Sequence, residues 1–355
     1  MPDKVIVISL DAMGGDHGPS VVVPAAVQRL EASGGRLKLI LHGDRQAIET
    51  HLSGKRVPEG AVEIRHTDLV VAMDEKPAQA LRRGKGSSLW NAIESVKSGQ
   101  ADAIVSAGNT GALMAISKLQ LRMAVPDLER PAIVAAWPTV KGHTAVLDVG
   151  ANVSSDAHQL IEFAIMGAAF HRAVLGSKNP SIGLLNVGSE DAKGHEEVRE
   201  AHTLLRERDF GLNYFGFVEG TDIGKGTVDV IVTDGFTGNV ALKTAEGTAR
   251  FISGLMKDAL MSSPLSRLGA LLAAPALKKM RRRIDPSSIN GGPLLGLNGI
   301  VVKSHGGADV RGFTNAIRVA EDLVSSGFAN EIARNLERMS SIMSSPAAPV
   351  ESRES

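Results

Sequence analysis

The chain has 355 residues, its 39 Lys and Arg side chains are balanced by 39 Asp and Glu, and it contains no cysteine. Nucleic-acid binding usually needs a basic excess, so the zero net charge disfavours that class. Without cysteine there can be no disulfide, no thiolate metal site and no acyl-cysteine intermediate. The first apolar run, Val5–Leu10, is too short for a signal peptide, and no stretch approaches the ~20 apolar residues that span a bilayer.

Short apolar strands alternate with helical patterns over the first two thirds of the chain. We expect strands at 5–10, 37–41, 62–66, 103–106, 133–136, 145–149, 182–185, 214–218 and 228–232. Helices are expected at 19–32, 46–52, 88–98, 109–121 and 156–175, the last capped by Asp156. This alternation predicts an α/β fold with a mainly parallel sheet and helices on both faces.

The stretch from 239 to 290 has a helical pattern and no strand signal. Breaks are predicted at Ser262-Ser263-Pro264 and at Pro275. An apolar, alanine-rich piece, Leu265–Leu277, runs into a basic cluster formed by Lys278, Lys279, Arg281, Arg282 and Arg283. After a turn-rich segment at 290–296, we expect a strand at 300–303 and helices at 308–326 and 328–343. The organisation is therefore a single α/β unit over 1–343 with a helical arm at about 245–290, followed by a disordered tail at 344–355.

Several predicted strands end in loops that combine Gly with Asp, Asn or Thr. Ligands in open α/β sheets bind at the carboxyl ends of strands, so these loops are the candidate site. The loop at 106–112 is the best phosphate cradle, because main-chain N–H groups at the start of the next helix favour an anion. Its candidate phosphate-binding residues are Gly108, Asn109, Thr110 and Gly111. The alternative is an ordinary Asn/Thr helix cap.

Four further loops carry candidate reactive side chains. Asp16 and His17 could handle a proton, or their loop could be only a strained turn. Lys193 lies near a helix start, where a cation is unfavourable unless an anion is close, although a solvated lysine is equally compatible. Asp234 precedes a predicted helix, and His305 stands beside two glycines at a strand end.

Four familiar motifs are missing from the chain. There is no G-x-G-x-x-G after a strand, no G-x-x-x-x-G-K-[ST], no G-x-S-x-G and no H-E-x-x-H. These absences disfavour a dinucleotide-binding protein, a P-loop enzyme, a serine hydrolase and a zincin. We expect neither a metal nor a cofactor.

The loops taken together resemble the PlsX family over about 300 residues. The matching segments are LDAMGGDHGP (10–19), MDEKPAQALRRGKGSS (73–88), VSAGNTGALM (105–114), LDVGAN (147–152), GLLNVGSEDAKG (183–194), GFVEGTDI (216–223), TDGFTGNVALK (233–243) and GPLLGLNGIVVKSHGGA (292–308). The resemblance implies acyl transfer from acyl carrier protein to inorganic phosphate. It also implies a three-layer sandwich similar to phosphotransacetylases and isocitrate dehydrogenases, with the helical segment appended.

The resemblance further implies a cytoplasmic homodimer with peripheral membrane contact in some members. Its product, an acyl phosphate, would be used in phospholipid synthesis by a membrane acyltransferase, PlsY. No nucleic acid is expected as a partner.

Within this scheme we assign hypothetical roles to the candidate residues. Phosphate would attack the thioester directly, because no cysteine can carry the acyl group. Lys193 would bind phosphate or the oxyanion, and Asp16 with His17 would orient or shuttle a proton. Asn239 and His305 would donate hydrogen bonds to the carbonyl oxygen, and Asp234 would orient one of them.

The basic cluster at 278–283 leaves three interpretations open. It could dock the acidic carrier protein, lie on anionic lipid, or be the solvated end of a dimer-interface helix. Three alternative functions also stay open: an isocitrate-type dehydrogenase, a non-catalytic scaffold for lipid synthesis, and a phosphotransacetylase that uses acyl-coenzyme A.

Overall fold

The computed structural model describes residues 5–284 and 290–344, except for the side chains of residues 279 and 281–284. Eleven strands of this part form one sheet in the order β3-β2-β1-β4-β11-β10-β5-β6-β9-β7-β8. The strands are β1 (Ile6–Asp11), β2 (Leu37–Gly43), β3 (Val62–His66), β4 (Ala103–Ser106), β5 (Ala132–Pro138), β6 (His143–Leu147), β7 (Ser181–Leu185), β8 (Asn213–Val218), β9 (Val230–Val232), β10 (Gly292–Leu295) and β11 (Ile300–Lys303).

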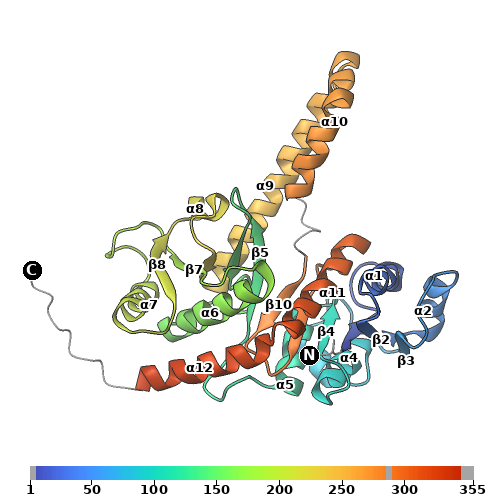
Figure 1. The fold of residues 1–355 in the computed structure, drawn as a ribbon, viewed down its shortest axis with the longest axis horizontal. Coiled ribbons are helices and arrows are strands. Elements are labelled where there is room, and N and C mark those ends of the chain that lie inside the picture. The colour runs from blue at the N-terminus through green and yellow to red at the C-terminus, as the bar shows by residue number, and fades with distance from the viewer. Residues whose placement is uncertain (1–4, 285–289, 345–355) are drawn as a thin grey trace, which may run out of the picture.

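The helices cover both faces of this sheet (Figure 1). They are α1 (Pro19–Ala32), α2 (Arg45–Leu52), α3 (Pro77–Arg83), α4 (Ser88–Lys97), α5 (Thr110–Leu121), α6 (Ala157–Phe170), which continues as a π-helical turn (His171–Leu175), α7 (Glu196–Glu207), α8 (Gly220–Lys225), α9 (Gly235–Met261), α10 (Pro264–Ile284), α11 (Val310–Ser325) and α12 (Phe328–Ser344).

The sheet consists of two parallel groups that run in opposite directions. β3, β2, β1, β4 and β11 are mutually parallel and form the first half. β10 and then β5 follow, each antiparallel to its neighbour, and β6 is antiparallel to β5. β6, β9, β7 and β8 form the second half and are again mutually parallel. The carboxyl ends of the two groups therefore lie at opposite edges of the sheet.

Two hydrophobic clusters, one on each face, complete the predicted three-layer sandwich. The first lies under α1, α6, α11 and α12 and contains the fully buried Phe163, Phe170 and Phe313. The second lies under α4 and α5 and reaches across the sheet to Leu242 of α9. Helix α6 is buried from Leu160 to Phe170 because both its strand side and its α12 side are covered. Asp156 caps it as predicted, accepting a hydrogen bond from Gln159 N at 2.8 Å.

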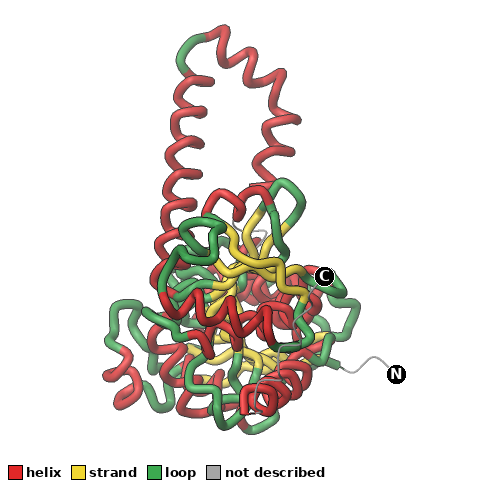
Figure 2. Tube along the Cα trace, turned by 90° about the vertical axis from the view of Figure 1, so that its left-hand side faces the viewer, coloured by secondary structure: helices red, strands yellow, loops and turns green. Residues whose placement is uncertain are grey.

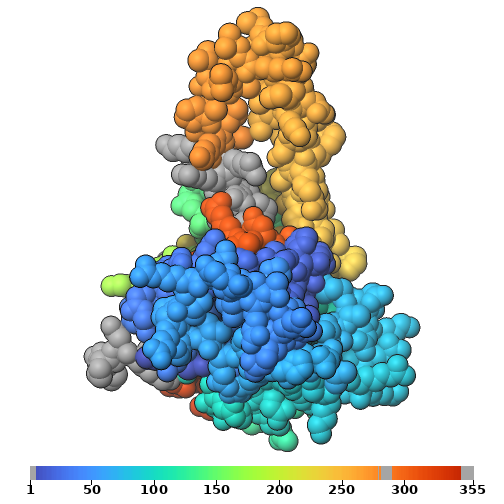
Figure 3. Space-filling view, turned by 90° about the vertical axis from the view of Figure 1, so that its right-hand side faces the viewer, coloured from blue at the N-terminus to red at the C-terminus, as the bar shows by residue number. Residues whose placement is uncertain are grey.

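Helices α9 and α10 form an arm that projects from the body of the molecule (Figures 1 to 3). The predicted break at Ser262-Ser263-Pro264 is confirmed, because α9 ends at Met261 and α10 begins at Pro264. The predicted break at Pro275 is wrong, since α10 continues through it. Residue 271, whose carbonyl loses its bond to this proline, is exposed, so water can replace the missing donor. No helix of the described residues is long and apolar enough to cross a membrane.

The sequence signals missed three elements. Helices α3 and α8 are short, and β10 is a Gly-Pro-Leu-Leu segment inside the stretch expected to be turn-rich. The helix expected after Lys193 is α7, which begins at Glu196. Strand β10 forms because it fills the gap between β11 and β5 in the middle of the sheet. The tail predicted at 344–355 lies, beyond Ser344, outside the described residues.

Candidate active site

Three neighbouring strands of the first half bring three loops to one edge of the sheet. β4 pairs in parallel with β1 on one side and with β11 on the other. The loops that follow are the Asp16 loop (12–18), the anion loop (107–109) and the His305 loop (304–309). Asp16 N donates to the carbonyl of Gly306 at 2.9 Å, which joins the Asp16 loop to the His305 loop, and Gly14 packs against Gly108 of the anion loop. The structure therefore brings Asp16, His305 and the predicted phosphate cradle together.

A buried carboxylate underlies the anion loop. Ser106 Oγ donates to Asp11 Oδ2 at 2.7 Å, and Gly108 N donates to Ser106 Oγ at 2.9 Å. Burial raises the pKa of the Asp11 carboxyl, and the hydrogen bonds that it accepts work in the opposite direction. A Cβ atom on Gly14 would lie 2.5 Å from Asp11 Oδ2 and 2.8 Å from Gly108 N. Glycine at 14 is therefore what allows the Asp16 loop to pass over the anion loop.

The Asn109 side chain already has several partners. Its Oδ1 accepts from Ala112 N at 3.0 Å and so caps α5. Its Nδ2 donates to the carbonyls of Ala72, Met73 and Glu75 at 3.3, 2.9 and 2.8 Å. Asn109 thus fixes a distant loop to the anion loop. The predicted phosphate contact is left to main-chain N–H groups at the start of α5.

The remaining cradle residues begin α5. Thr110 is exposed, and Gly111 packs against Pro77 of α3, whose Cγ would lie 2.7 Å from a Cβ at position 111. The glycine at 111 is therefore explained by helix packing as well as by any anion. The phosphate role of these residues stays a prediction.

Lys303, the last residue of β11, was not among the predicted site residues. Its Nζ donates to the carbonyl of Ala107 at 3.2 Å and also to that of Ser304. Burial lowers the pKa of Lys303 to about 8, and the charge of Lys243 acts in the same direction, while Asp11 and Asp16 oppose it. A cation that ends an otherwise apolar strand was the sequence signal for this residue.

Asp16 and His305 flank one glycine of the His305 loop. A Cβ at Gly307 would lie 3.2 Å from Asp16 Oδ2 and 3.7 Å from His305 Nδ1. Gly307 N donates to His305 Nδ1 at 3.1 Å, which leaves the proton of a neutral imidazole on Nε2. His305 can therefore donate a hydrogen bond from Nε2, as its hypothetical role requires. His17 is exposed beside Asp16.

The second half carries its loops at the opposite edge. Asp148, directly after β6, is fully buried and accepts from Ile133 N at 3.0 Å and from Asn152 N at 2.6 Å. Burial raises the pKa of the Asp148 carboxyl, against the effect of these hydrogen bonds. A Cβ on Gly235 would lie 2.6 Å from Asp148 Oδ2. Asp148 therefore fixes the loop against which the first residue of α9, Gly235, packs.

Asp234 and Asn239 stand at the start of α9. Asp234 caps the helix, accepting from Thr237 N at 2.9 Å and from Thr237 Oγ1 at 2.7 Å. Both carboxylate oxygens of Asp234 thus accept hydrogen bonds from Thr237. The role of Asp234 in orienting an oxyanion donor stays a prediction. Asn239 is exposed beside Gly150, where an added Cβ would meet Asn239 Cβ at 3.6 Å.

Lys193 lies in the loop after β7, at the same edge as Asp234. Its Nζ is 2.8 Å from Glu190 Oε1, and the hydrogen bond to Glu190 raises the pKa of Lys193. Asn186 Nδ2 holds the loop by donating to the Lys193 carbonyl at 3.0 Å. Lys193 is exposed, and its ammonium group pairs with Glu190 and makes no described contact with the anion loop.

Helix α9 begins at the second edge, and its first two turns pack on the body of the molecule, where Leu242 contacts the cluster under α4 and α5. Lys243 follows at the next position, where its Nζ pairs with Glu246 Oε2 at 3.0 Å and its charge lowers the pKa of Lys303. Asn239 and Lys243 are four residues apart and so lie on one side of α9, about 6 Å apart along its axis. The candidate site is therefore this face, between the start of α5 and the first turns of α9.

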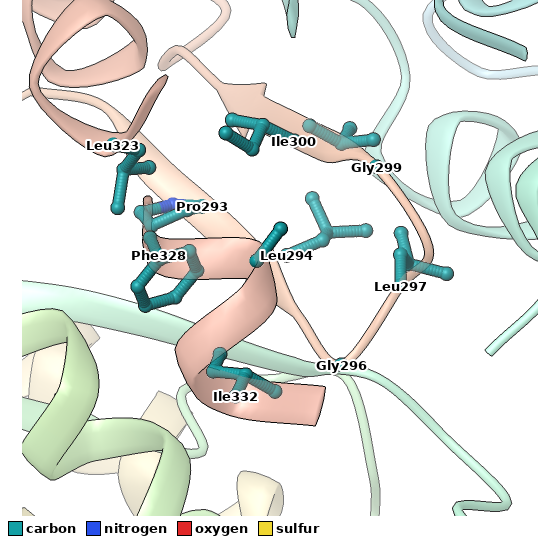
Figure 4. Close-up of a pocket in the computed structure, with 11 residues that line it drawn as sticks. Pro293, Leu294, Gly296, Leu297, Gly299, Ile300, Leu323, Phe328 and Ile332 are labelled. Atoms are coloured by element: carbon teal, nitrogen blue, oxygen red, sulfur yellow. The ribbon is translucent and has the colours of Figure 1, made fainter. Parts of the chain in front are cut away.

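Two cavities lie elsewhere. One, of about 10 Å³, is lined by apolar side chains of β10, β11, α11 and α12, including Leu294, Phe328 and Ile332 (Figure 4). It has room for about one water molecule. A wider depression of about 260 Å³ borders Glu129, Asp156 and Glu197. Neither is lined by a predicted site residue, and among the described residues no three His, Asp or Glu side chains are arranged to hold a metal ion.

The chain is similar to proteins of known name over nearly its whole length. A family described as fatty acid synthesis protein matches residues 6–331. A phosphate acyltransferase from Caulobacter vibrioides is 67% identical over 334 residues, which are 94% of this chain and 92% of that protein. One from Phenylobacterium zucineum is 59% identical over 344 residues, 97% of each chain.

Solved structures share the fold at low sequence identity. EutD phosphotransacetylase from Staphylococcus aureus has a TM-score of 0.58 at 16% identity, covering 90% of this chain and 94% of its own. A phosphotransacetylase from Streptococcus pyogenes has a TM-score of 0.56 at 18% identity, with 95% of each chain covered. The chain belongs to the fatty acid synthesis protein family, which is the PlsX family indicated by its loops, and hence to the acyltransferases.

Proposed function

We propose that this protein transfers a long-chain fatty acyl group from acyl carrier protein to inorganic phosphate, releasing an acyl phosphate for phospholipid synthesis. The relatives named phosphate acyltransferase support the acceptor. The family description supports a donor from fatty acid synthesis. Membership of an acyltransferase family speaks against the isocitrate-type dehydrogenase.

The observation that carries the proposal is that the start of α5 lies beside Lys303 at the carboxyl edge of β1, β4 and β11. The main-chain N–H groups of the first turn of α5 lie there, and a hydrogen bond to the Ala107 carbonyl holds the ammonium group of Lys303 beside them. Helix N-termini and partly buried cations are where proteins hold small anions. A phosphate placed here faces the first turns of α9 across the sheet.

The reaction forms one C–O bond between the acyl carbon and a phosphate oxygen and breaks one C–S bond. A phosphate oxygen attacks the thioester carbon, the tetrahedral oxyanion collapses, and the thiolate leaves and takes up a proton. Phosphate is already a nucleophile, and a thiol with a pKa of ~8.5 is a good leaving group. Positioning and oxyanion stabilisation are therefore the main requirements. Asn239 and the Nε2–H of His305 are the proposed oxyanion donors, and Asp16 with His17 carries the proton.

Lys193 is the least supported member of this scheme. It is paired with Glu190 at 2.8 Å and would have to exchange this partner for phosphate or the oxyanion. We expect Lys193→Ala to lower kcat/KM at least 10-fold while Lys178→Ala, an exposed lysine on the same half, leaves it unchanged. Turnover by Lys193→Ala at the normal rate would remove this residue from the mechanism.

We propose that the α9–α10 arm docks the carrier protein. Leu265, Leu271 and Leu272 expose 78, 71 and 77% of their surface there, and Lys278 is exposed at the start of the basic cluster. Lys279 and Arg281–Arg283 have side chains outside the described residues. Apolar and basic groups together suit an acidic protein partner, while lipid contact and a dimer interface are the competing uses. A homodimer, a cytoplasmic location and functional coupling to PlsY are part of the same proposal.

A donor comparison tests the proposed function. Acyl-phosphate formation is measured from palmitoyl-acyl carrier protein plus phosphate, beside palmitoyl-coenzyme A at matched concentration. We expect a strong preference for the carrier protein. Equal or better use of coenzyme A would indicate the phosphotransacetylase type of enzyme, whose fold this chain shares. Product from neither donor would favour the scaffold.

A further inference from the structure

Lys303 is a partly buried cation without a neutralising ion pair. Its Nζ donates to the carbonyls of Ala107 and Ser304, which uses two of the three N–H groups of an ammonium. Among the described residues, no carboxylate oxygen comes within 4.0 Å of this Nζ. The third N–H group and the positive charge are therefore available to another group.

The position of this cation is fixed by the sheet. Lys303 is opposite Ser106 in the β11–β4 ladder, so its stem starts one residue from the anion loop. The bond to the Ala107 carbonyl fastens its head to that loop. An anion that sits on the N–H groups at the start of α5 thus lies beside an ammonium group whose place does not depend on a flexible loop.

A second cation faces it from the other half. Lys243 is exposed on the second turn of α9, where its Nζ pairs with Glu246 Oε2 at 3.0 Å, and its charge lowers the pKa of Lys303. The charges of Asp11 and Asp16 act in the opposite direction and raise the pKa of Lys303. An anion with two charges bound at Lys303 would attract Lys243 away from Glu246, because a dianion offers each ammonium group a full negative charge.

We propose that Lys303, with Lys243 opposite it, binds the inorganic phosphate dianion. The inference rests on the proposed function and names the side chains that hold its acceptor. The donor's pantetheine arm also carries a phosphate, but as a diester with a single charge. The partly buried place of Lys303 and the presence of two cations favour the small dianion.

Protection from chemical labelling tests the proposal on the unaltered protein. Lysines are acylated with an amine-selective reagent at increasing inorganic phosphate, and each site is quantified by mass spectrometry. Phosphate should reduce labelling of Lys303 at least fivefold while Lys118, an exposed lysine in the last turn of α5, is unaffected. Unchanged labelling of Lys303, or protection by holo carrier protein but not by phosphate, would overturn the proposal.

Variants separate this inference from the proposed function. Lys303→Met should raise KM for phosphate at least 10-fold and change KM for the acyl donor less than threefold, with Lys118→Met as the matched control. Lys303→Arg, which keeps the charge, should have a phosphate KM between those of the wild type and Lys303→Met. If Lys303→Met does not fold, Lys303→Arg is the variant whose phosphate KM is measured. A wild-type protein that makes acyl phosphate, together with folded Lys303 variants of normal phosphate KM, would refute only this inference. A wild-type protein that makes none would refute the proposed function instead.

Discussion

Gly14 has no room for a side chain. Its Cβ position is 2.5 Å from a buried carboxylate oxygen and 2.8 Å from the anion-loop nitrogen of Gly108. We expect Gly14→Ala to lower kcat/KM at least 10-fold and to cost about 1–3 kcal/mol of unfolding free energy, as overpacking does. Gly247→Ala in α9, where an added Cβ meets no atom within 4 Å, is the control for kinetics and denaturation. Equal behaviour of the two variants would contradict this view of the loop.

Lys303 should also make stability depend on pH. Its pKa is about 8 in the folded chain and 10.5 in the unfolded chain, so between these values the unfolded chain binds more protons. Stability therefore rises with pH in this window, and the penalty of the buried charge is fully present below pH 8. Relative to Lys303→Met, the wild-type unfolding free energy should increase by about 2 kcal/mol from pH 7.5 to 9.5. Parallel curves from denaturant titrations would show that the amine is not buried as a charge.

At the scale of elements, Asn109 joins α5 to the loop before α3. Asn109→Asp keeps the oxygen that caps α5 but places a carboxylate against the carbonyls of Ala72, Met73 and Glu75. Residues 72–75 should then exchange amide hydrogens at least 10-fold faster, while α5 stays protected. Asn109→Ala should lose the cap as well, at a cost of about 1 kcal/mol. Unaltered exchange at 72–75 in both variants would show that this loop is held by other contacts.

The arm is the element whose role is most open to experiment. Replacing Lys278, Lys279 and Arg281–Arg283 with Glu should raise KM for acyl carrier protein at least 10-fold and leave KM for acyl-coenzyme A unchanged. Binding to vesicles with anionic lipid and the sedimentation mass are measured on the same variant. Loss of vesicle binding alone would favour the lipid interpretation, and loss of the dimer alone the interface.

At the scale of the whole molecule, the opposed strand directions of the two halves of the sheet decide where the loops of the candidate site lie. They place the anion loop and the Asp148 loop at opposite edges, and the first turns of α9 begin beside the Asp148 loop. A phosphate held by Lys303 and Lys243 would therefore touch both halves. Phosphate at 100 times its dissociation constant should stabilise the folded chain by about 2.7 kcal/mol. We expect phosphate to raise the melting temperature of one cooperative thermal transition. Two transitions, of which phosphate shifts only one, would argue against a site shared by both halves.

The sequence by itself determined the α/β alternation, the helix caps, the break at 262–264 and the family, because these depend on local periodicity and on short loop motifs. It also identified most of the loops around the site. Strand direction was decided only by the tertiary structure, because the sheet reverses through three antiparallel pairs, and the β10–β5 pair in the middle joins residues more than 150 positions apart. Lys303 escaped prediction for the same reason, since it gains its place beside Ala107 only when β11 pairs with β4. Burial and long-range pairing, which no local pattern encodes, select it from the lysines of the chain.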